Sequence, residues 1–469
     1  MEPETQPEHA DLLLSGGWLI TVDPERRIFR HGAVAVEGGR IVAVGQAADL
    51  SARYRADRTI DTTGRVVTPG LVNGHRHLLT TAKGALPEGK ATLANLKDFV
   101  YPTFAAIGAD DIRAYAVHHA AALLRFGVTL FEEPGCTHLE AAIDGLASTG
   151  IRARIGPWTW DQLGPAGVVN TDWLRMDTAA CLRRLEEGIE TVRAAGHPRI
   201  RDAVTIEGVG TCSDELQVGA ARLAADADSL LVLHKATSEQ EVVRELEVFG
   251  HRPVEHMYET GALNDHVLLN HMTSLAEFEV EQLAETGARI SQNPSSALKL
   301  AKGTTQTGKW PELVRAGVPI ALGTDADNAS NHHDICRSMF LAALLPRDAR
   351  RDPNAVSAEQ ALEMGTIGGA TALRWDDAVG SIEVGKEADL VVFDTDDFDW
   401  RPLYNPVANL VYAATGHSVD TVVVGGDIVV EGKEFVHIDV EKARYDAERA
   451  SDRILAEIGA TPGPAWPVL

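Results

Sequence analysis

Two histidines separated by one residue follow a β-branched run and a Pro-Gly break in the stretch VTPGLVNGHRHL, residues 67–78. A spacing of two places His75 and His77 on the same face of an extended segment, so both imidazoles can reach one ion. Taken alone, a pair of this kind is more often incidental than a pair of metal ligands. The rest of the chain therefore has to supply the remaining ligands.

Three further polar side chains stand at the ends of apolar runs. His234 ends LLVLH, His271 ends VLLNH and Asp325 ends PIALGTD. Each alone has an ordinary structural interpretation, since a buried histidine can be satisfied in a core and Asp325 could cap the helix that follows it. Such residues in the order His-x-His, His, His, Asp are hard to obtain by chance. Imidazoles with one carboxylate suit a divalent metal, with zinc favoured and iron, cobalt or manganese as alternatives.

A metal held in this way would support hydrolysis. It lowers the pKa of a bound water toward neutrality and so makes hydroxide available at pH 7. A carboxylate at the ion can accept the proton, and a histidine outside the metal's coordination can polarise the substrate or stabilise a developing oxyanion. The five residues together predict a hydrolytic metal centre.

The elements that position these residues are short, buried-looking strands alternating with helical segments. The strands are predicted in GLVNGH, GVTLFEE, RARIGPW, AVTIEGV, LLVLHKA, HVLLNHMT, ARISQNP and VPIALGTD. Helical periodicity lies between them, as in residues 110–127 and 238–250. This alternation predicts an α/β fold, the (β/α)8 TIM barrel, whose active sites lie at the carboxyl ends of the strands. The polar residues close the first, fifth, sixth and eighth strands.

Short β segments of another character occupy both ends of the chain. Residues 11–66 alternate apolar and polar side chains between Gly-Gly and Asp turns, and the pattern returns in 385–397 and in the Gly-Gly hairpin of 421–435. We therefore expect one small composite β-sandwich, the barrel, and a charged helical tail on the outside. Their expected ranges are 1–66 with 376–440, 67–375, and 441–469.

Composition limits the partners. The 469 residues carry 43 Lys and Arg against 68 Asp and Glu, a net charge of −25. Phosphate binding relies on clustered cations, so this charge disfavours nucleic acid or an anionic membrane surface as a partner. The four cysteines form no CxxC pair and predict neither disulfides nor a thiolate zinc site. Without a secretory signal or an apolar run of roughly 18 residues, a cytoplasmic protein is expected.

The chain resembles the amidohydrolase superfamily, in the branch of triazine hydrolases and cytosine- or guanine-deaminase-like enzymes. The likeness runs nearly the full length and rests on DLLLSGGWLITVD, PGLVNGHRHL, VLLNHMT, NPSSALKLAKG, GVPIALGTDADNASNHHD and GSIEVGKEADLVVFD. It implies a metal ion held by His75, His77, His234 and Asp325, a substrate-facing catalytic role for His271, and a homodimer or larger homo-oligomer. The superfamily's bridging lysine is absent from AVTIEGVGTC, so one metal ion per chain is expected rather than two.

One departure from this branch bears on the reaction. Its deaminases usually carry a Glu three residues after the fifth-strand histidine, where it moves protons between water, ring nitrogen and leaving amine. Here that position is Thr237, and Glu239 is expected to face away. Phenylurea and thiocarbamate (molinate) hydrolases are therefore the expected neighbours in character, since their substrates need less ring protonation. Glu207, at the end of the fourth strand, is a candidate substitute acid–base, although a structural role explains it about as well.

Other residues are weaker candidates for the pocket. Glu133 could also supply the missing carboxylate, but a structural role is favoured. Trp158 could form an apolar wall for a hydrophobic substrate, with Thr237 and His332 as further substrate-binding candidates; aromatic packing beneath the loops explains Trp158 equally well. The segment 78–102 is predicted as a long loop of the type that shapes substrate choice.

The main hypothesis is a mononuclear metal-dependent hydrolase of a C–N, or related C–S, bond in a small amide-, urea- or carbamate-like molecule. Metal-bound hydroxide attacks, Asp325 takes the proton and His271 steadies the polarised oxygen. One alternative is an aminohydrolase or dechlorinase of a nitrogen heterocycle, using a replacement for the absent Glu. Another is a non-catalytic scaffold, against which the intact set of polar residues argues.

Overall fold

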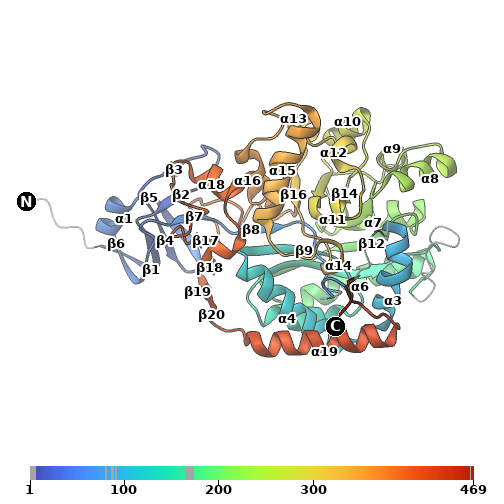
Figure 1. Cartoon of the computed structure of the whole chain (residues 1–469), viewed down its shortest axis with the longest axis horizontal. Helices are drawn as coiled ribbons and strands as arrows, with labels where there is room; N and C mark the ends of the chain where they lie inside the picture. The colour runs from blue at the N-terminus through green and yellow to red at the C-terminus, as the bar shows by residue number, and fades with distance from the viewer. Residues whose placement is uncertain are drawn as a thin grey trace, which may run out of the picture.

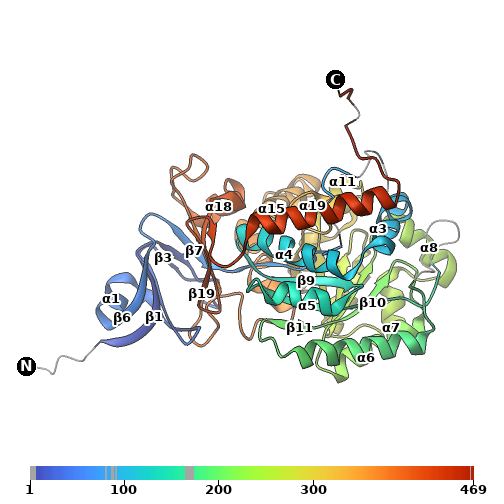
Figure 2. The same ribbon diagram turned by 90° about the horizontal axis from the view of Figure 1, so that it is seen from below.

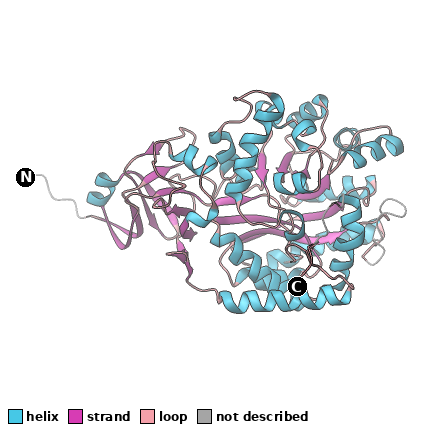
Figure 3. Cartoon of the chain, in the orientation of Figure 1, coloured by secondary structure: helices cyan, strands magenta, loops and turns pink. Residues whose placement is uncertain are grey.

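The computed structural model describes residues 7–79, 82–85, 89, 92–163, 174–464 and 466–468. Its centre is a parallel sheet with helices around it (Figures 1 and 3), and its strands follow one another in the order of the chain. The backbone N–H of Gly74 donates to the carbonyl of Leu322 at 2.8 Å and joins the last strand to the first. The predicted (β/α)8 barrel is confirmed. Its strands are β8 (Leu71–Asn73), β9 (Val128–Cys136), β10 (Arg152–Thr159), β12 (Val204–Gly208), β13 (Leu231–Lys235), β14 (Val267–His271), β15 (Arg289–Gln292) and β16 (Ile320–Leu322).

The barrel strands are buried on both faces, since all residues of β9, β12, β13 and β14 are shielded from solvent. This is why they read as continuous apolar runs rather than as alternating ones. The helices around them expose one polar face, as the periodicity of residues 110–127 and 238–250 predicts. They include α4 (Ala109–Arg125), α5 (Leu139–Ala147), α6 (Thr178–Ala195), α7 (Asp214–Asp226), α8 (Glu239–Phe249), α10 (Glu277–Thr286), α13 (Trp310–Arg315), α15 (Ile335–Arg350), α16 (Ala358–Met364) and α17 (Ile367–Ala372).

Strands from both ends of the chain share a sheet beside the barrel. β7 (Val66–Pro69) pairs antiparallel with β17 (Leu390–Phe393), and Figure 1 shows the blue N-terminal and red C-terminal strands side by side. That sheet runs in the order β20-β19-β18-β17-β7-β2-β3 and a second one in the order β5-β4-β1-β6. Their other members are β1 (Glu8–Ser15), β2 (Trp18–Ile20), β3 (Ile28–Phe29), β4 (Gly32–Glu37), β5 (Arg40–Gln46), β6 (Tyr54–Asp61), β18 (Val419–Val424), β19 (Asp427–Glu431) and β20 (Glu434–Phe435).

The two sheets enclose a small core of their own. Leu12 and Val34 from the second sheet pack with Leu390 and Val423 from the first. A buried ion pair connects this region to the barrel: Arg152 of β10 donates twice to the carboxylate of Asp389, at 2.9 Å each. The chain ends therefore form an additional sheet region that is attached to the barrel.

The helix α19 (Val440–Glu457) lies along the outside of the barrel (Figure 2). It packs on α4 and on α3 (Tyr101–Ala106) through an apolar stripe that includes Ala447 and Ile454. Ser451 shares a hydrogen bond of 3.0 Å with the hydroxyl of Tyr115, and Arg453 donates to the carbonyl of Ala106 at 3.0 Å. The charged terminal helix is thus bound to the barrel helices that precede β9.

Within the described part of the chain, no helix combines the length and the apolar character needed to cross a membrane. The four cysteines are buried and form no disulfide.

Candidate active site

The end of β8 carries the first two predicted ligands into the mouth of the barrel. His75 is fully buried and His77 is 7% exposed, and their ring centroids are 4.9 Å apart. The carbonyl of His75 accepts the backbone N–H of Asp325 at 2.9 Å, which fixes the end of β8 against the loop after β16. A Cβ on Gly323 would lie 2.8 Å from the Cβ of His75, so a glycine is needed at this approach.

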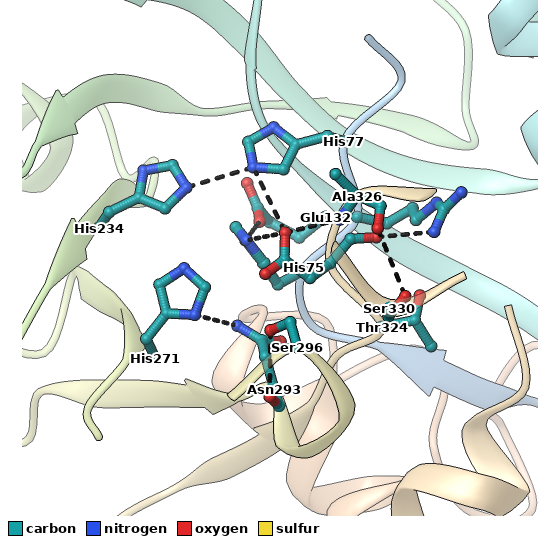
Figure 4. Close-up of polar contacts among 12 residues, drawn as sticks. His75, His77, Glu132, His234, His271, Asn293, Ser296, Thr324, Ala326 and Ser330 are labelled. Atoms are coloured by element: carbon teal, nitrogen blue, oxygen red, sulfur yellow. Dashed lines mark hydrogen bonds and ion pairs between the residues drawn. The ribbon is translucent and has the colours of Figure 1, made fainter. Parts of the chain in front are cut away.

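His234 and Asp325 complete the group from β13 and from the loop after β16. The Nε2 atoms of His234 and His77 are 3.3 Å apart. Oδ1 of Asp325 lies 3.7 Å from Nε2 of His75 and 4.0 Å from Nε2 of His77. Asp325 does not cap a helix, because α14 (Asp327–Ser330) starts after Ala326 and has no side-chain cap. Figure 4 shows the imidazoles converging on a common point.

These residues fit a divalent ion. Both ring nitrogens of His75 are buried without a hydrogen-bond partner among the described residues, an arrangement that is costly unless another group satisfies them. Burial lowers the pKa of His75 to about 4 and that of His77 well below its ordinary value. Both rings are therefore neutral at pH 7, with lone pairs available to a metal.

The second ring nitrogen of each ligand histidine faces an oxygen. Nδ1 of His75 lies 3.8 Å from Oε2 of Glu132, and Nδ1 of His77 lies 3.9 Å from Oε1 of Glu133. Nδ1 of His234 lies 2.9 Å from the backbone carbonyl of Glu207. The 2.9 Å contact keeps the proton of His234 on Nδ1 and leaves its Nε2 for a metal, whereas the two glutamates lie beyond hydrogen-bonding distance of His75 and His77. Glu133 is thus beside a ligand rather than in the cavity wall, and the sequence did not reveal Glu132.

His271 differs from His234 in its tautomer. Nδ2 of Asn293 donates to Nδ1 of His271 at 3.1 Å, so the ring carries its proton on Nε2. His271 lines the cavity and can donate from Nε2 to a substrate. One of its nitrogens also lies within 4.8 Å of nitrogens of His75 and His234, so metal content decides between the two roles.

A cavity lies above this group and has an apolar wall. Trp158 and Phe104 pack edge to face, with ring centroids 5.1 Å apart. Trp158, Thr237 and Glu207, all predicted from the sequence, line it. His332 is not among the described lining residues, and its Nε2 is 2.6 Å from the hydroxyl of Ser295. The described lining residues are His77, Thr92, Asn95, Leu96, Val100, Phe104, Trp158, Glu207, Val209, His234, Thr237, His271, Leu300, Lys302, Asp325, Ala326, Asn328 and Ala329.

The described part of segment 78–102 is partly helical rather than a loop throughout. It contains α2 (Thr92–Asn95), a π-helical turn (Leu96–Val100) and the start of α3. Phe99 packs with Ala329, while Leu96 and Val100 line the cavity, so burial of apolar side chains favours helical turns here. Tyr101 donates from its hydroxyl to Oε1 of Glu207 at 2.6 Å and thereby holds that carboxylate in the wall.

Thr237 is hydrogen-bonded to the carboxylate of Glu241, a residue that was not predicted from the sequence. Its backbone N–H and its hydroxyl each donate to Oε2 of Glu241 at 2.7 Å. Because the hydroxyl proton is directed to Glu241, the Thr237 oxygen presents lone pairs to the cavity. The S-x-x-E pattern from Ser238 to Glu241 is a helix-start signal that could have indicated a glutamate folded back toward this loop. Glu239 faces away, as expected, and accepts from Ser274 at 2.7 Å.

Arg76, between the two ligand histidines, points away from the cavity. It forms an ion pair with Asp327 and donates to the carbonyl of Asp325 at 2.7 Å. The same guanidinium reaches Nδ1 of His119 at 2.9 Å. His119, Asp327 and His333 form a second cluster of ligand-type atoms, but the Arg76 cation is already bonded there.

Comparison with known proteins gives consistent likenesses. Residues 66–429 match the model of the amidohydrolase family, and residues 32–56 match that of an imidazolonepropionase-like composite domain of bacteria. A 5-methylthioadenosine/S-adenosylhomocysteine deaminase of Syntrophobacter fumaroxidans is 35% identical over 442 residues, 93% of this chain and 98% of that protein. A 5'-deoxyadenosine deaminase of Methanosarcina mazei is 28% identical over 454 residues, 96% of this chain and all of the other.

Two solved structures of zinc-containing hydrolases are similar to this chain over nearly its full length. An adenosine deaminase from Xanthomonas campestris with bound zinc has a TM-score of 0.87 and 31% identity, covering 96% of this chain and 100% of its own. An atrazine chlorohydrolase from Arthrobacter aurescens complexed with zinc has a TM-score of 0.80 and 25% identity, covering 94% of this chain and 100% of its own.

Proposed function

Because the chain belongs to the amidohydrolase family and deaminases match it nearly end to end, we propose that it is a metal-dependent aminohydrolase of a nitrogen heterocycle. Adenine-type nucleosides are the substrate class. The observation that carries this proposal is a complete His75, His77, His234 and Asp325 group beneath an apolar cavity, in a chain that deaminases match nearly end to end. It replaces the urea and carbamate hypothesis as the main one, because the relatives reported above are deaminases and an atrazine chlorohydrolase.

The metal would be held by Nε2 of the three ligand histidines and Oδ1 of Asp325, and zinc is favoured by the solved relatives. When bound, the ion supplies a water of lowered pKa as the nucleophile. One ion per chain is proposed, since strand β12 carries no lysine that could bridge a second one.

The chain's own residues perform the remaining steps. Trp158 and Phe104 provide a surface on which an aromatic ring can lie and from which water is excluded. The backbone N–H of Ala326 donates to Oδ1 of Asp325. Oδ2 accepts no hydrogen bond from the described residues. Oδ2 is therefore free to accept a proton from water and to return it to the leaving amine. Nε2–H of His271 holds the oxygen that becomes bonded to the ring carbon.

Glu207 is proposed as a second proton carrier. Its carboxylate lines the cavity, Oε1 accepts from Tyr101, and Oε2 lies 3.4 Å from Nδ1 of His234. This position supports two uses, orienting His234 or accepting a proton in the cavity.

A second candidate function is supported by Thr237. A hydroxyl that donates to Glu241 cannot carry protons at neutral pH as a glutamate at this position would. Ureas, carbamates and thiocarbamates lose an aryl amine or thiol without protonation of a ring, so they would tolerate this replacement.

Product analysis of the metal-loaded protein distinguishes the two. Adenosine and 5-methylthioadenosine are incubated in parallel with a phenylurea, a thiocarbamate and an aminotriazine, and ammonia, aryl amine and thiol are measured. We expect ammonia and the corresponding oxo product from the nucleosides, and no product with His77→Ala. Aryl amine or thiol release without any ammonia from the nucleosides would overturn the proposal in favour of the second candidate.

A further inference from the structure

Lys302 is a buried cation in the wall of the cavity that the site described so far does not use. It follows α11 (Pro294–Lys299), is 7% exposed, and lines the cavity together with His271 and Asp325. Neither the family comparison nor the sequence motifs assign it a role.

Its ammonium group has no hydrogen-bond or ion-pair partner among the described residues, although its backbone N–H is bonded to Ala297. The other buried cations among the described residues are bonded to carboxylates or backbone carbonyls. Lys235 bonds Glu245 at 2.5 Å, and Arg152 bonds Asp389. Burying an unpaired ammonium is costly, so a chain that keeps one at the wall of a cavity leaves its donors for a bound molecule.

Lys302 lies next to the reacting groups, since it shares the wall of the cavity with His271, Asp325 and Thr237. Burial lowers the pKa of its ammonium group, and the carboxylates of Asp325 and Glu241 oppose that shift. Glu241 is the residue that fixes Thr237, so Lys302 faces the part of the cavity where the branch's proton-carrying glutamate is replaced.

We infer that Lys302 is a catalytic residue whose ammonium donates a hydrogen bond to the substrate atom that gains negative charge when water adds to the neighbouring carbon. The inference rests on the proposed function only for the identity of that atom, the ring nitrogen beside the attacked carbon; in a urea or carbamate it is the carbonyl oxygen. A fixed donor aimed at developing charge in a water-poor cavity is among the strongest contributions an enzyme makes.

The step balances without any further reagent. Asp325 takes one proton of the water, the oxygen bonds to the ring carbon, and the electron pair of the C=N bond moves to the ring nitrogen held by Lys302. The proton on Asp325 then passes to the amino group, the bond to that group breaks, and ammonia leaves as the C=N bond re-forms. The hydroxy product shifts its remaining proton from oxygen to ring nitrogen. Lys302 keeps its own proton throughout.

The test compares Lys302→Met with Lys309→Met in the metal-loaded enzyme. Lys309 is a matched control because it lies outside this cavity and pairs with Glu277 at 3.5 Å on the surface. We expect Lys302→Met to keep about one metal per chain and a melting midpoint at or above that of the wild type, because a costly buried charge is removed, while kcat falls about 10²- to 10³-fold and KM changes much less. Lys309→Met keeps wild-type kcat.

Chemical rescue separates a hydrogen-bond donor from a structural residue. In Lys302→Ala, added ethylammonium should restore kcat saturably, whereas tetramethylammonium, which has the charge but no N–H, should not. Wild-type kcat in Lys302→Met, a parallel loss of metal, or equal effects of the two cations would overturn the inference.

Failure of the proposed function would be recognised separately. If the wild type hydrolyses a phenylurea or thiocarbamate but no nucleoside, the proposed function falls and the Lys302 comparison is made on that substrate. If the metal-loaded wild type hydrolyses nothing in the panel, both fall.

Discussion

At the scale of single residues, Glu207 lies between His234, a proposed metal ligand, and the cavity. It is held by Tyr101 and faces His234 while lining the cavity. Glu207→Gln can still accept the Tyr101 hydrogen bond but cannot take a proton. If Glu207 carries protons, kcat should fall about 10²- to 10⁴-fold at full metal content, whereas the control Tyr101→Phe should cost about tenfold or less. Weaker metal binding with normal turnover per bound ion would instead assign Glu207 to orienting His234.

His271 is expected to act on the transition state and not on the metal. The Asn293 hydrogen bond leaves its Nε2 protonated, and a protonated nitrogen cannot be a ligand. His271→Ala should therefore retain about one metal per chain while kcat falls roughly 10²- to 10³-fold. Elemental analysis gives the metal content, with His77→Ala as the variant expected to be empty. Loss of metal in step with activity would make His271 a ligand.

The clustering of the proposed ligand residues could be predicted from the sequence because each of them ends or follows an apolar strand. Glu132 could not, since it lies inside β9 next to another glutamate and only the strand's register turns it toward His75. Lys302 could not either, because it comes from the segment after β15, and only the folded barrel brings it beside His271 and Asp325. Residues that reach a site from loops do not follow an apolar strand, so the sequence pattern does not indicate that they belong to the site.

At the scale of elements, Arg76 connects the loop after β8 to the loop after β16. Its ion pair with Asp327 is fully buried, and it also bonds the carbonyl of Asp325. Arg76→Met leaves the buried carboxylate of Asp327 without its arginine, which should lower the free energy of unfolding by about 3–5 kcal/mol. Metal affinity should fall about 10- to 100-fold, because the two ligand-bearing loops lose their connection.

Denaturant unfolding and metal titration measure these two effects. The matched control is the double variant Arg76→Met/Asp327→Asn. It also removes the unpaired negative charge of Asp327 and should recover part of the lost free energy of unfolding. A single variant as stable as the wild type, or a double variant no better than the single one, would refute this account of the ion pair.

The barrel strands were predictable as elements because each is a largely buried run, and most of them end at or just before a polar residue or a glycine. The helical turns within 92–102 were not, because their apolar residues are too few for a clear period and only contact with the cavity and α14 shows which side they bury. The short strands of the outer sheets were visible as alternation, but their order, which interleaves both chain ends, depends on pairings such as that of Val67 with Val392.

At the scale of the whole molecule, α19 stabilises the helices that form one wall of the site. It is bonded to α4 and to the end of α3, the helix that carries Tyr101 and Phe104. Removing residues 440–469 should therefore raise KM as well as lower the melting midpoint by several degrees, on the order expected for losing a few kcal/mol.

Full-length variants test the same point without a truncation. Ile454→Asp, which places a charge in the buried stripe of α19, should reproduce both effects, and Ser451→Ala, which removes one hydrogen bond, should change the midpoint only slightly. An unchanged KM in the truncated and Ile454→Asp proteins would show that α19 has no influence on the cavity.

The sheet shared by both chain ends also has a consequence for how the protein is made. Thr395 beside β17 bonds the carbonyl of Gly64 beside β7, and 331 residues separate them along the chain. At a synthesis rate of about 5–20 residues per second, the early strand waits on the order of 15 to 65 seconds for its partner to leave the ribosome. During that interval β7 and its neighbours present unpaired backbone edges, which invite pairing with other nascent chains. Yield in cells should therefore depend on translation speed and on chaperones that cover the first 70 or so residues, even where the finished enzyme is stable.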